Sequence, residues 1–198
     1  VAGAGGGGRG GGRGGGGVGG GGAGGGGAAG AGVRWGRVGV HDTAALVAQA
    51  QGTEVLVHAL NPAYTHAAWR EQAPLLMEAA IAVARQLCAT LMLPGNVYNF
   101  GEAMPPVLRE DAPQAATGFM GRMRVQLEQR LQAATRQGDL RAIVLRAGDF
   151  FGSGTGSWLD QAIAKDLPRG RVTWPGPLDV ATPWAYLPDL ARTLVRVA

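Results

Sequence analysis

The stretch HAAWREQAPLLMEAAIAVARQLCATLMLPG, residues 66–95, decides the fold because it joins two different hydrophobic patterns. Its first part, residues 66–88, is rich in Ala and Leu and predicts a helix, in which Pro74 predicts a late start or a kink. Its second part, ATLMLPG at residues 89–95, is a continuous apolar run and predicts a buried strand. A strand without polar alternation is typical of a parallel sheet that is covered on both faces.

The same succession of helices and apolar strands continues on both sides of this stretch. EVLVHAL, residues 54–60, is an apolar run of strand length, and LRAIVLRAG, residues 140–148, is another. Between the second and third strands lie a polar loop, residues 96–117, and a helix that ends at Gly138. Strands separated by helices in this way predict a doubly wound α/β fold. Ligands in such folds bind beyond the carboxyl ends of the strands.

Shorter segments complete the predicted order. Asp42 is a good N-cap for a helix over residues 43–51, which Gly52 closes. After the third strand, the glycine loop FFGSGTGS leads into a short helix, WLDQAIAKDL, and a last helix begins at Pro188. Three loops directly follow strands and are the expected places for binding residues: Asn61-Pro62, residues 94–101 and residues 146–156.

The helix GFMGRMRVQLEQRLQ, residues 118–132, carries an apolar stripe with helical spacing. The stripe consists of Met120, Met123, Leu127, Leu131 and Ala134, and it predicts a face packed in the core. Three arginines lie off the stripe: Arg122, Arg124 and Arg130. From the pattern alone, these arginines form either a solvated basic face or part of a functional site.

The first 32 residues differ in composition from the rest of the chain. They contain 22 of the 36 glycines and otherwise only Ala, Val and Arg, so they predict a disordered segment without a core. The run GGGRGGGRGGGG resembles RNA-binding tails, but it has no aromatic residues to stack on bases. A plain flexible leader, or a start site placed too early, is therefore the favoured explanation. Residues 33–198 are the part expected to fold.

Charge and cysteine content set broad limits on function. The net charge of +4 comes from scattered arginines and does not favour nucleic acid as a partner. Cys88 is the only cysteine, which excludes an intrachain disulfide and fits a reducing compartment. No apolar run reaches membrane-spanning length and no secretory leader is recognisable, so a soluble cytoplasmic protein is expected. The histidines and the cysteine show no metal-ligand spacing, and no metal site is predicted.

Five stretches together resemble the NAD-dependent epimerase/dehydratase group of extended, atypical short-chain dehydrogenases/reductases. They are DTAALVAQAQGTEVLVHALNP, LMLPGNVYNFG, LREDAPQ, LRAGDFFGSGTGSW and WAYLPDLA, and they follow the family's order. The resemblance implies a Rossmann-like sheet that binds NAD or NADP, with the start of a substrate-binding part after about residue 150. It also implies a Ser or Thr after one strand and a Tyr-x-x-x-Lys motif on the next helix.

Carried over residue by residue, the resemblance exposes replacements at the reaction centre. Phe100-Gly101 takes the family's Tyr-Gly place, which puts Asn96 where Ser or Thr belongs. Arg124 falls at the lysine and Met120 at the tyrosine, and methionine has no proton to give or take. The cofactor-lining positions implied by the family are Asn61, Pro94, Gly95, Ala147 and Gly148.

Tyr98 is a candidate substitute for the missing acid/base. A tyrosine needs a nearby cation to act at neutral pH, and Arg124 is the candidate cation. The alternatives are a loop tyrosine packed against its neighbours and, for Arg124, one more exposed helix arginine. His58, inside an apolar strand, is interpreted as a buried histidine rather than a base.

The family's phosphate-binding G-x-x-G-x-x-G sequence is not recognisable between a strand and a helix, and Gly39 stands where an adenine-contacting Asp is common. The chain also ends soon after Asp189, so the Rossmann-like fold is expected to be incomplete at both ends.

The leading hypothesis is an NAD(P)-dependent epimerase/dehydratase or oxidoreductase acting on a sugar nucleotide or similar hydroxylated substrate. The catalytic candidates are Asn96, Tyr98 and Arg124. The alternative is a non-catalytic nucleotide-binding or regulatory module on the same fold, and RNA association through the first 32 residues is a third hypothesis. The family also implies a homodimer through the helices near 66–88 and 118–136.

Overall fold

The computed structural model describes residues 36–102, 104–152 and 156–198, so the predicted disordered segment, residues 1–32, lies outside the described residues. The chain divides into two compact units, Val1–Leu145 and Arg146–Ala198. The boundary lies close to the predicted start of the substrate-binding part, whose function stays a prediction.

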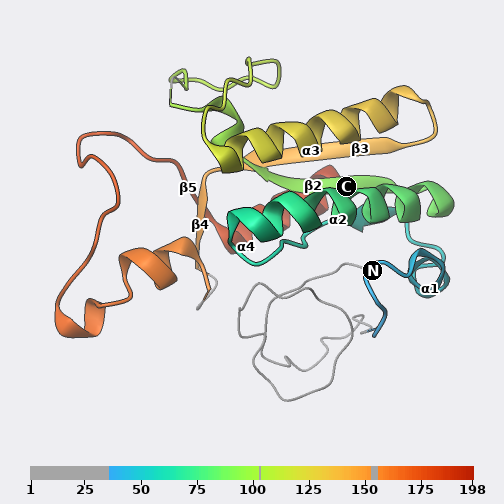
Figure 1. Ribbon diagram of the computed structural model, residues 1–198, viewed down its shortest axis with the longest axis horizontal. Helices are drawn as coiled ribbons and strands as arrows, with labels where there is room; N and C mark the ends of the chain where they lie inside the picture. The colour runs from blue at the N-terminus through green and yellow to red at the C-terminus, as the bar shows by residue number, and fades with distance from the viewer. Residues whose placement is uncertain (1–35, 103, 153–155) are drawn as a thin grey trace. The chain divides into compact units, whose positions relative to one another are not determined.

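The first unit is built on a sheet in the order β1-β2-β3 (Figure 1). Strands β1 (Val55–Val57) and β2 (Thr90–Asn96) pair in parallel, with Val55 opposite Thr90 and Val57 opposite Met92. Strand β3 (Arg141–Ala147) is the third member of the sheet. The predicted α/β class with parallel strand pairing is confirmed, although β1 is shorter than the apolar run at 54–60.

Three α-helices belong to the described part of this unit, residues 36–102 and 104–145. Helix α1 (Thr43–Gln49) starts where predicted, because the Asp42 side chain accepts a hydrogen bond from the Ala45 N–H at 3.0 Å. Helix α2 (His66–Leu87) precedes β2, and α3 (Phe119–Arg136) precedes β3. Figure 1 shows α2 and α3 running alongside the strands.

The predicted late start of α2 is wrong, because the helix begins at His66 with Thr65 as its N-cap and continues through Pro74. The Thr65 hydroxyl accepts a hydrogen bond from the Ala68 N–H at 3.2 Å. Proline removes one backbone hydrogen bond from a helix interior. Buried side chains on both sides of Pro74 offset this loss, with Trp69 and Ala73 before it and Met77 after it.

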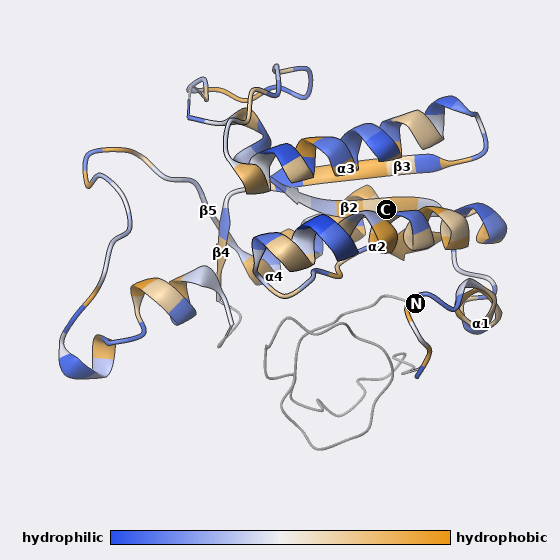
Figure 2. Cartoon of the chain, in the orientation of Figure 1, coloured by the Kyte–Doolittle hydropathy of each residue, from blue (hydrophilic) through white to orange (hydrophobic). Residues whose placement is uncertain are grey.

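A single apolar core joins α2, α3 and the strands, and Figure 2 shows the mixed polar and apolar sides of both helices. The predicted stripe on α3 is confirmed: Met123, Leu127, Leu131 and Ala134 are buried, and Met120 packs against the core at its edge. The other buried core residues are Leu56, Trp69, Ala73, Met77, Ile81, Val83, Ala84, Leu91, Leu93 and Leu140.

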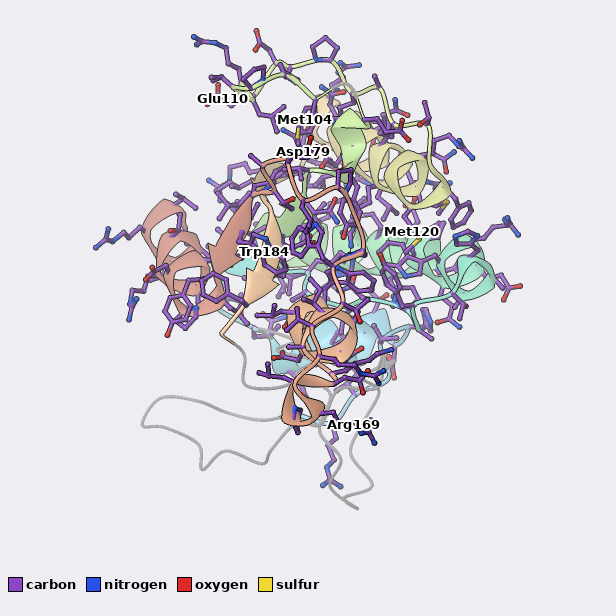
Figure 3. All side chains as sticks on the ribbon, turned by 90° about the vertical axis from the view of Figure 1, so that its left-hand side faces the viewer. Met104, Glu110, Met120, Arg169, Asp179 and Trp184 are labelled. Atoms are coloured by element: carbon purple, nitrogen blue, oxygen red, sulfur yellow. The ribbon has the colours of Figure 1, made fainter. Side chains whose placement is uncertain are left out.

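The second unit contains two short strands that the sequence did not predict. Strands β4 (Asp149–Phe151) and β5 (Trp184–Tyr186) pair in parallel, with Asp149 opposite Trp184 (Figure 3). The last helix, α4 (Leu187–Val197), starts one residue before the predicted Pro188.

The predicted helix WLDQAIAKDL is wrong in type. The structure has a five-residue π-helical turn, η2 (Leu159–Ile163), followed by a 3-10 turn, η3 (Leu167–Arg169). Ser157 and Asp160 cap the first turn reciprocally, because each side chain accepts the other's backbone N–H, at 3.0 and 3.2 Å. Leu167-Pro168 then prevents a regular helix from continuing, since proline lacks the backbone donor.

No helix among residues 36–102, 104–152 and 156–198 is both long enough and apolar enough to cross a membrane.

Candidate functional site

The carboxyl ends of β1 and β2 lie at the same edge of the sheet, because the two strands are parallel. Beyond β1 come His58 and then Asn61, which is exposed. Beyond β2 come Asn96, its last residue, and the 3-10 turn η1 (Tyr98–Phe100). The Asn96 side-chain oxygen accepts a hydrogen bond from the Tyr98 N–H at 3.1 Å, which holds the turn against the strand end. The structure therefore brings Asn96 and Tyr98 together.

Turn η1 lies directly against the start of helix α3. An added Cβ at Gly121 would meet the Tyr98 carbonyl oxygen and the Ala116 side chain. Only glycine allows this approach, so Gly121 fixes the distance between Tyr98 and the helix that carries Arg124.

We expect Gly121→Ala to lower the free energy of unfolding by about 2 kcal/mol, because the new methyl group displaces backbone rather than a flexible side chain. Gly118→Ala, three residues earlier, is the matched control, since nothing lies within 4 Å of an added Cβ there. Urea unfolding of both variants measures the difference. Equal loss in the two variants would contradict a close contact between η1 and α3.

Arg124 is half-buried and does not belong to a solvated face, which excludes the exposed-arginine alternative. Its guanidinium carbon lies 4.7 Å from the centroid of the Trp69 ring, on helix α2. Burial lowers the pKa of the Arg124 guanidinium. Attraction to three neighbouring side chains opposes this shift only in part: those of Tyr64, Tyr98 and Glu128.

The long loop between η1 and α3 is tied to the same helix face. Glu128, one turn after Arg124, is buried, and its carboxylate accepts a hydrogen bond from the Gln114 side chain at 2.7 Å. A buried carboxylate near a buried guanidinium is stabilised by the opposite charge. The loop thus contacts the buried carboxylate of Glu128, the acidic residue near Arg124.

His58 lies directly beyond β1, interacts electrostatically with Arg124 and is buried, as the sequence predicted. The backbone N–H of His58 donates to the Met92 carbonyl at 2.8 Å, which extends the β1–β2 pairing by one residue. Burial lowers the pKa of His58 to about 4, and repulsion from Arg124 contributes in the same direction. His58 is therefore neutral at physiological pH.

The implied cofactor-lining residues fall in different places. Asn61 is in the loop beyond β1, and Pro94 and Gly95 are within β2. Pro94 lies beyond the part of β2 that pairs with β1, which ends at Met92, so this pairing does not need the N–H that proline lacks. Ala147 and Gly148 lie near the start of the second unit, where an added Cβ at Gly148 would strike the Pro183 backbone. Gly148 thus has a packing role within that unit.

Met120, labelled in Figure 3, belongs to the apolar stripe of α3 and packs against the core. Beside it, the Phe119 ring lies 4.3 Å from the His66 ring and 5.2 Å from the Arg70 guanidinium. The position that the family resemblance assigns to the acid/base is thus occupied by a packing residue.

Sequence reasoning missed three residues of the site. Trp69 is fully buried under Arg124, Tyr64 stands edge-on to Trp69 at 6.3 Å between ring centroids, and Asn99 is completely buried in η1. Within the described part of the chain, several buried polar atoms here have no hydrogen-bond partner: Trp69 Nε1, Gln72 Oε1, both Asn99 amide atoms and Arg124 Nε. The positions of Tyr64 and Asn99, in loops that follow strands, offered a signal. The contact between Trp69 on α2 and Arg124 on α3 leaves no local pattern in the sequence.

Among the described residues, no group of three or more His, Cys, Asp and Glu side chains is placed to hold a metal ion.

No family model matches the sequence, and no curated protein matches it at a significant level. Solved structures do match the fold. UDP-N-acetylglucosamine 4-epimerase from Bacillus cereus is similar over 80% of this chain and 57% of its own, with a TM-score of 0.68 and 13% identity. UDP-glucose 4-epimerase from Brucella ovis, in complex with NAD, covers 82% of this chain and 59% of its own, with a TM-score of 0.61 and 17% identity.

The Bordetella bronchiseptica enzyme WbmG, in complex with NAD and UDP, covers 83% of this chain and 53% of its own, with a TM-score of 0.64 and 16% identity. This chain thus spans between 53% and 59% of the length of these three proteins. The predicted Rossmann-like fold is confirmed, and it is the fold of NAD-dependent epimerases and dehydratases.

Proposed function

We propose that this chain is the dinucleotide-binding part of an NAD(P)-dependent epimerase/dehydratase or oxidoreductase that acts on a sugar nucleotide or similar hydroxylated substrate. The observation that carries the proposal is the position of Arg124. A charged, half-buried guanidinium lies beside Tyr98 and next to the carboxyl edge of the parallel strands, where ligands bind in this class of fold.

The residues present fit the ribose and nicotinamide end of a dinucleotide. Arg124 carries further N–H donors on its terminal guanidinium nitrogens, and a ribose hydroxyl or a phosphate oxygen is a suitable acceptor for them. Asn61, Pro94 and Gly95 would line the cofactor from the ends of β1 and β2. For Ala147, the last residue of β3, and Gly148, the cofactor-lining role stays a prediction of the family resemblance.

NAD(P), when bound, would supply a hydride acceptor and donor. Asn96 and Tyr98 would then hold the reacting hydroxyl of the substrate, with the Tyr98 phenol oxygen exchanging its proton. Arg124 would keep positive charge beside that phenol without itself transferring a proton. Met120 takes no part in these steps, because its side chain packs in the core.

A non-catalytic nucleotide-binding or regulatory module on the same fold is the second candidate. It is favoured by Met120 at the acid/base position, since that side chain cannot transfer a proton. The two candidates share dinucleotide binding and differ in turnover.

A homodimer and a cytoplasmic location are further parts of the proposal. The family resemblance implies a dimer through α2 and α3, but the apolar sides of these helices are used in the chain's own core. A dimer would therefore use their exposed sides, which carry Leu75 and the Arg130–Glu78 ion pair at 2.8 Å. Sedimentation of the purified protein at several concentrations tests this part.

Titration with NADH and NADPH, followed by nicotinamide fluorescence, tests the proposed function. We expect saturable binding, and Asn96→Ala together with Tyr98→Phe to leave this binding largely intact, since both residues are assigned to the substrate. Absence of binding at millimolar cofactor would contradict both candidates. Binding that persists without any hydride transfer to or from UDP-sugars would favour the non-catalytic module.

A further inference from the structure

Two buried N–H donors without partners lie next to each other between α2 and α3. The Trp69 side chain is 1% exposed, and neither its indole Nε1 nor Arg124 Nε has a hydrogen-bond partner in the described part of the chain. They are close, because the Arg124 guanidinium carbon lies 4.7 Å from the Trp69 ring centroid. Buried N–H donors nearly always have a hydrogen-bond acceptor in native proteins, so two neighbouring donors without one need an explanation.

Local side chains compensate the positive charge of Arg124 only in part. Burial lowers the pKa of Arg124, and the attraction of Tyr64, Tyr98 and Glu128 opposes this shift without cancelling it. Glu128, the acidic neighbour, also accepts a hydrogen bond from Gln114 at 2.7 Å. His58, whose pKa is lowered to about 4, adds no negative charge. An added anion would therefore stabilise Arg124 more than a neutral group would.

Two phenol rings close to these donors are exposed to solvent. Tyr64 is 65% exposed and stands edge-on against Trp69, at 82° between the ring planes. Tyr98 is 37% exposed and interacts electrostatically with Arg124. Both rings lie in loops that follow the strand ends, on the side where the substrate is expected.

We propose that Trp69 Nε1–H and Arg124 Nε–H form an oxyanion site that takes a carboxylate or phosphate group. Each of two oxygens of such a group can accept one donor, and the guanidinium supplies the charge. The oxyanion would belong to the substrate, and that part of the inference rests on the proposed function. The substrate class is then a hydroxylated compound with an acidic group close to its reacting carbon.

The anion site is tested without any dinucleotide, so its failure and that of the proposed function are distinguishable. The melting temperature of the full chain is measured at constant ionic strength while chloride is exchanged for acetate, malonate or phosphate. A specific site gives a saturable rise of roughly 3 °C at ten times the dissociation constant. Acetate and malonate report carboxylate binding, and phosphate reports phosphate binding.

Variants assign the effect to the two donors. Arg124→Gln should abolish the saturable rise in melting temperature. Arg124→Lys should raise the anion concentration needed for half of this rise at least tenfold, because lysine lacks the forked N–H donors of the guanidinium. Trp69→Phe keeps an aromatic ring under Arg124 and removes one N–H donor, so this variant should also bind the anion more weakly. Arg130→Gln, on the exposed side of the same helix, should behave like the wild type.

The proposal is overturned if none of these anions produces a saturable rise in the wild type. It is overturned equally if Arg124→Lys and Trp69→Phe, both folded, keep wild-type affinity. In that case the anions bind elsewhere on the basic surface.

Discussion

Arg124→Met is expected to lower the affinity for NADH at least tenfold while changing the free energy of unfolding at pH 7 by no more than about 1 kcal/mol. The affinity falls because the guanidinium is the proposed contact to the cofactor. Stability changes little because two contributions oppose each other: removing the charge relieves a desolvation cost, whereas buried Glu128 loses a nearby positive charge. Methionine keeps most of the volume over Trp69 and therefore avoids a large cavity.

This combination separates a functional arginine from a structural one. Urea unfolding and the fluorescence titration, made on the same preparations, give the two quantities. Arg130→Gln is the control, because Arg130 is exposed and pairs only at the surface with Glu78. A destabilised Arg124→Met variant with unchanged NADH affinity would show that Arg124 serves the fold instead.

Acidification is expected to destabilise the protein by about 3 kcal/mol between pH 7 and pH 4 through His58 alone. The pKa of His58 falls from 6.5 to about 4 on folding, so between these values the unfolded chain binds a proton that the folded chain rejects. Stability contributed by the neutral His58 is therefore present above pH 6.5 and is lost as the pH falls toward 4.

His58→Leu should remove this part of the acid dependence, because leucine suits the apolar cavity of about 70 Å³ that His58 lines with Leu56 and Leu60. His66→Gln, at an exposed position, should keep the wild-type dependence. Urea unfolding at pH 7, 5.5 and 4.5 measures the slopes. Identical slopes for His58→Leu and the wild type would mean that His58 is accessible to water.

The order of elements in the first unit could be predicted from the sequence, since local patterns determine it. The apolar runs became β1, β2 and β3, and the stripe from Met120 to Ala134 faces the core. Pro74 misled the prediction, because the burial of Trp69 and Met77 on either side outweighs one lost backbone bond.

Features that depend on distant parts of the chain could not be predicted. Strands β4 and β5 are three residues each and pair across more than thirty residues, so neither has a pattern of its own. Arg124 lies off the apolar stripe of its helix, and residues distant in the sequence, Trp69 on α2 among them, bury it. The family resemblance identified Arg124 as a candidate site residue, whereas its contact with Trp69 could be found only from the structure.

The central claim is that the ends of β1 and β2 hold a dinucleotide against Arg124. A ¹⁵N-correlated NMR titration with NADH tests it most directly, because backbone amides and the arginine Nε–H are observed together. The account predicts saturable shifts at Asn61, Asn96, Tyr98 and Arg124 Nε, with α1 unchanged. Shifts confined to other residues, or no shifts at millimolar NADH, would contradict it.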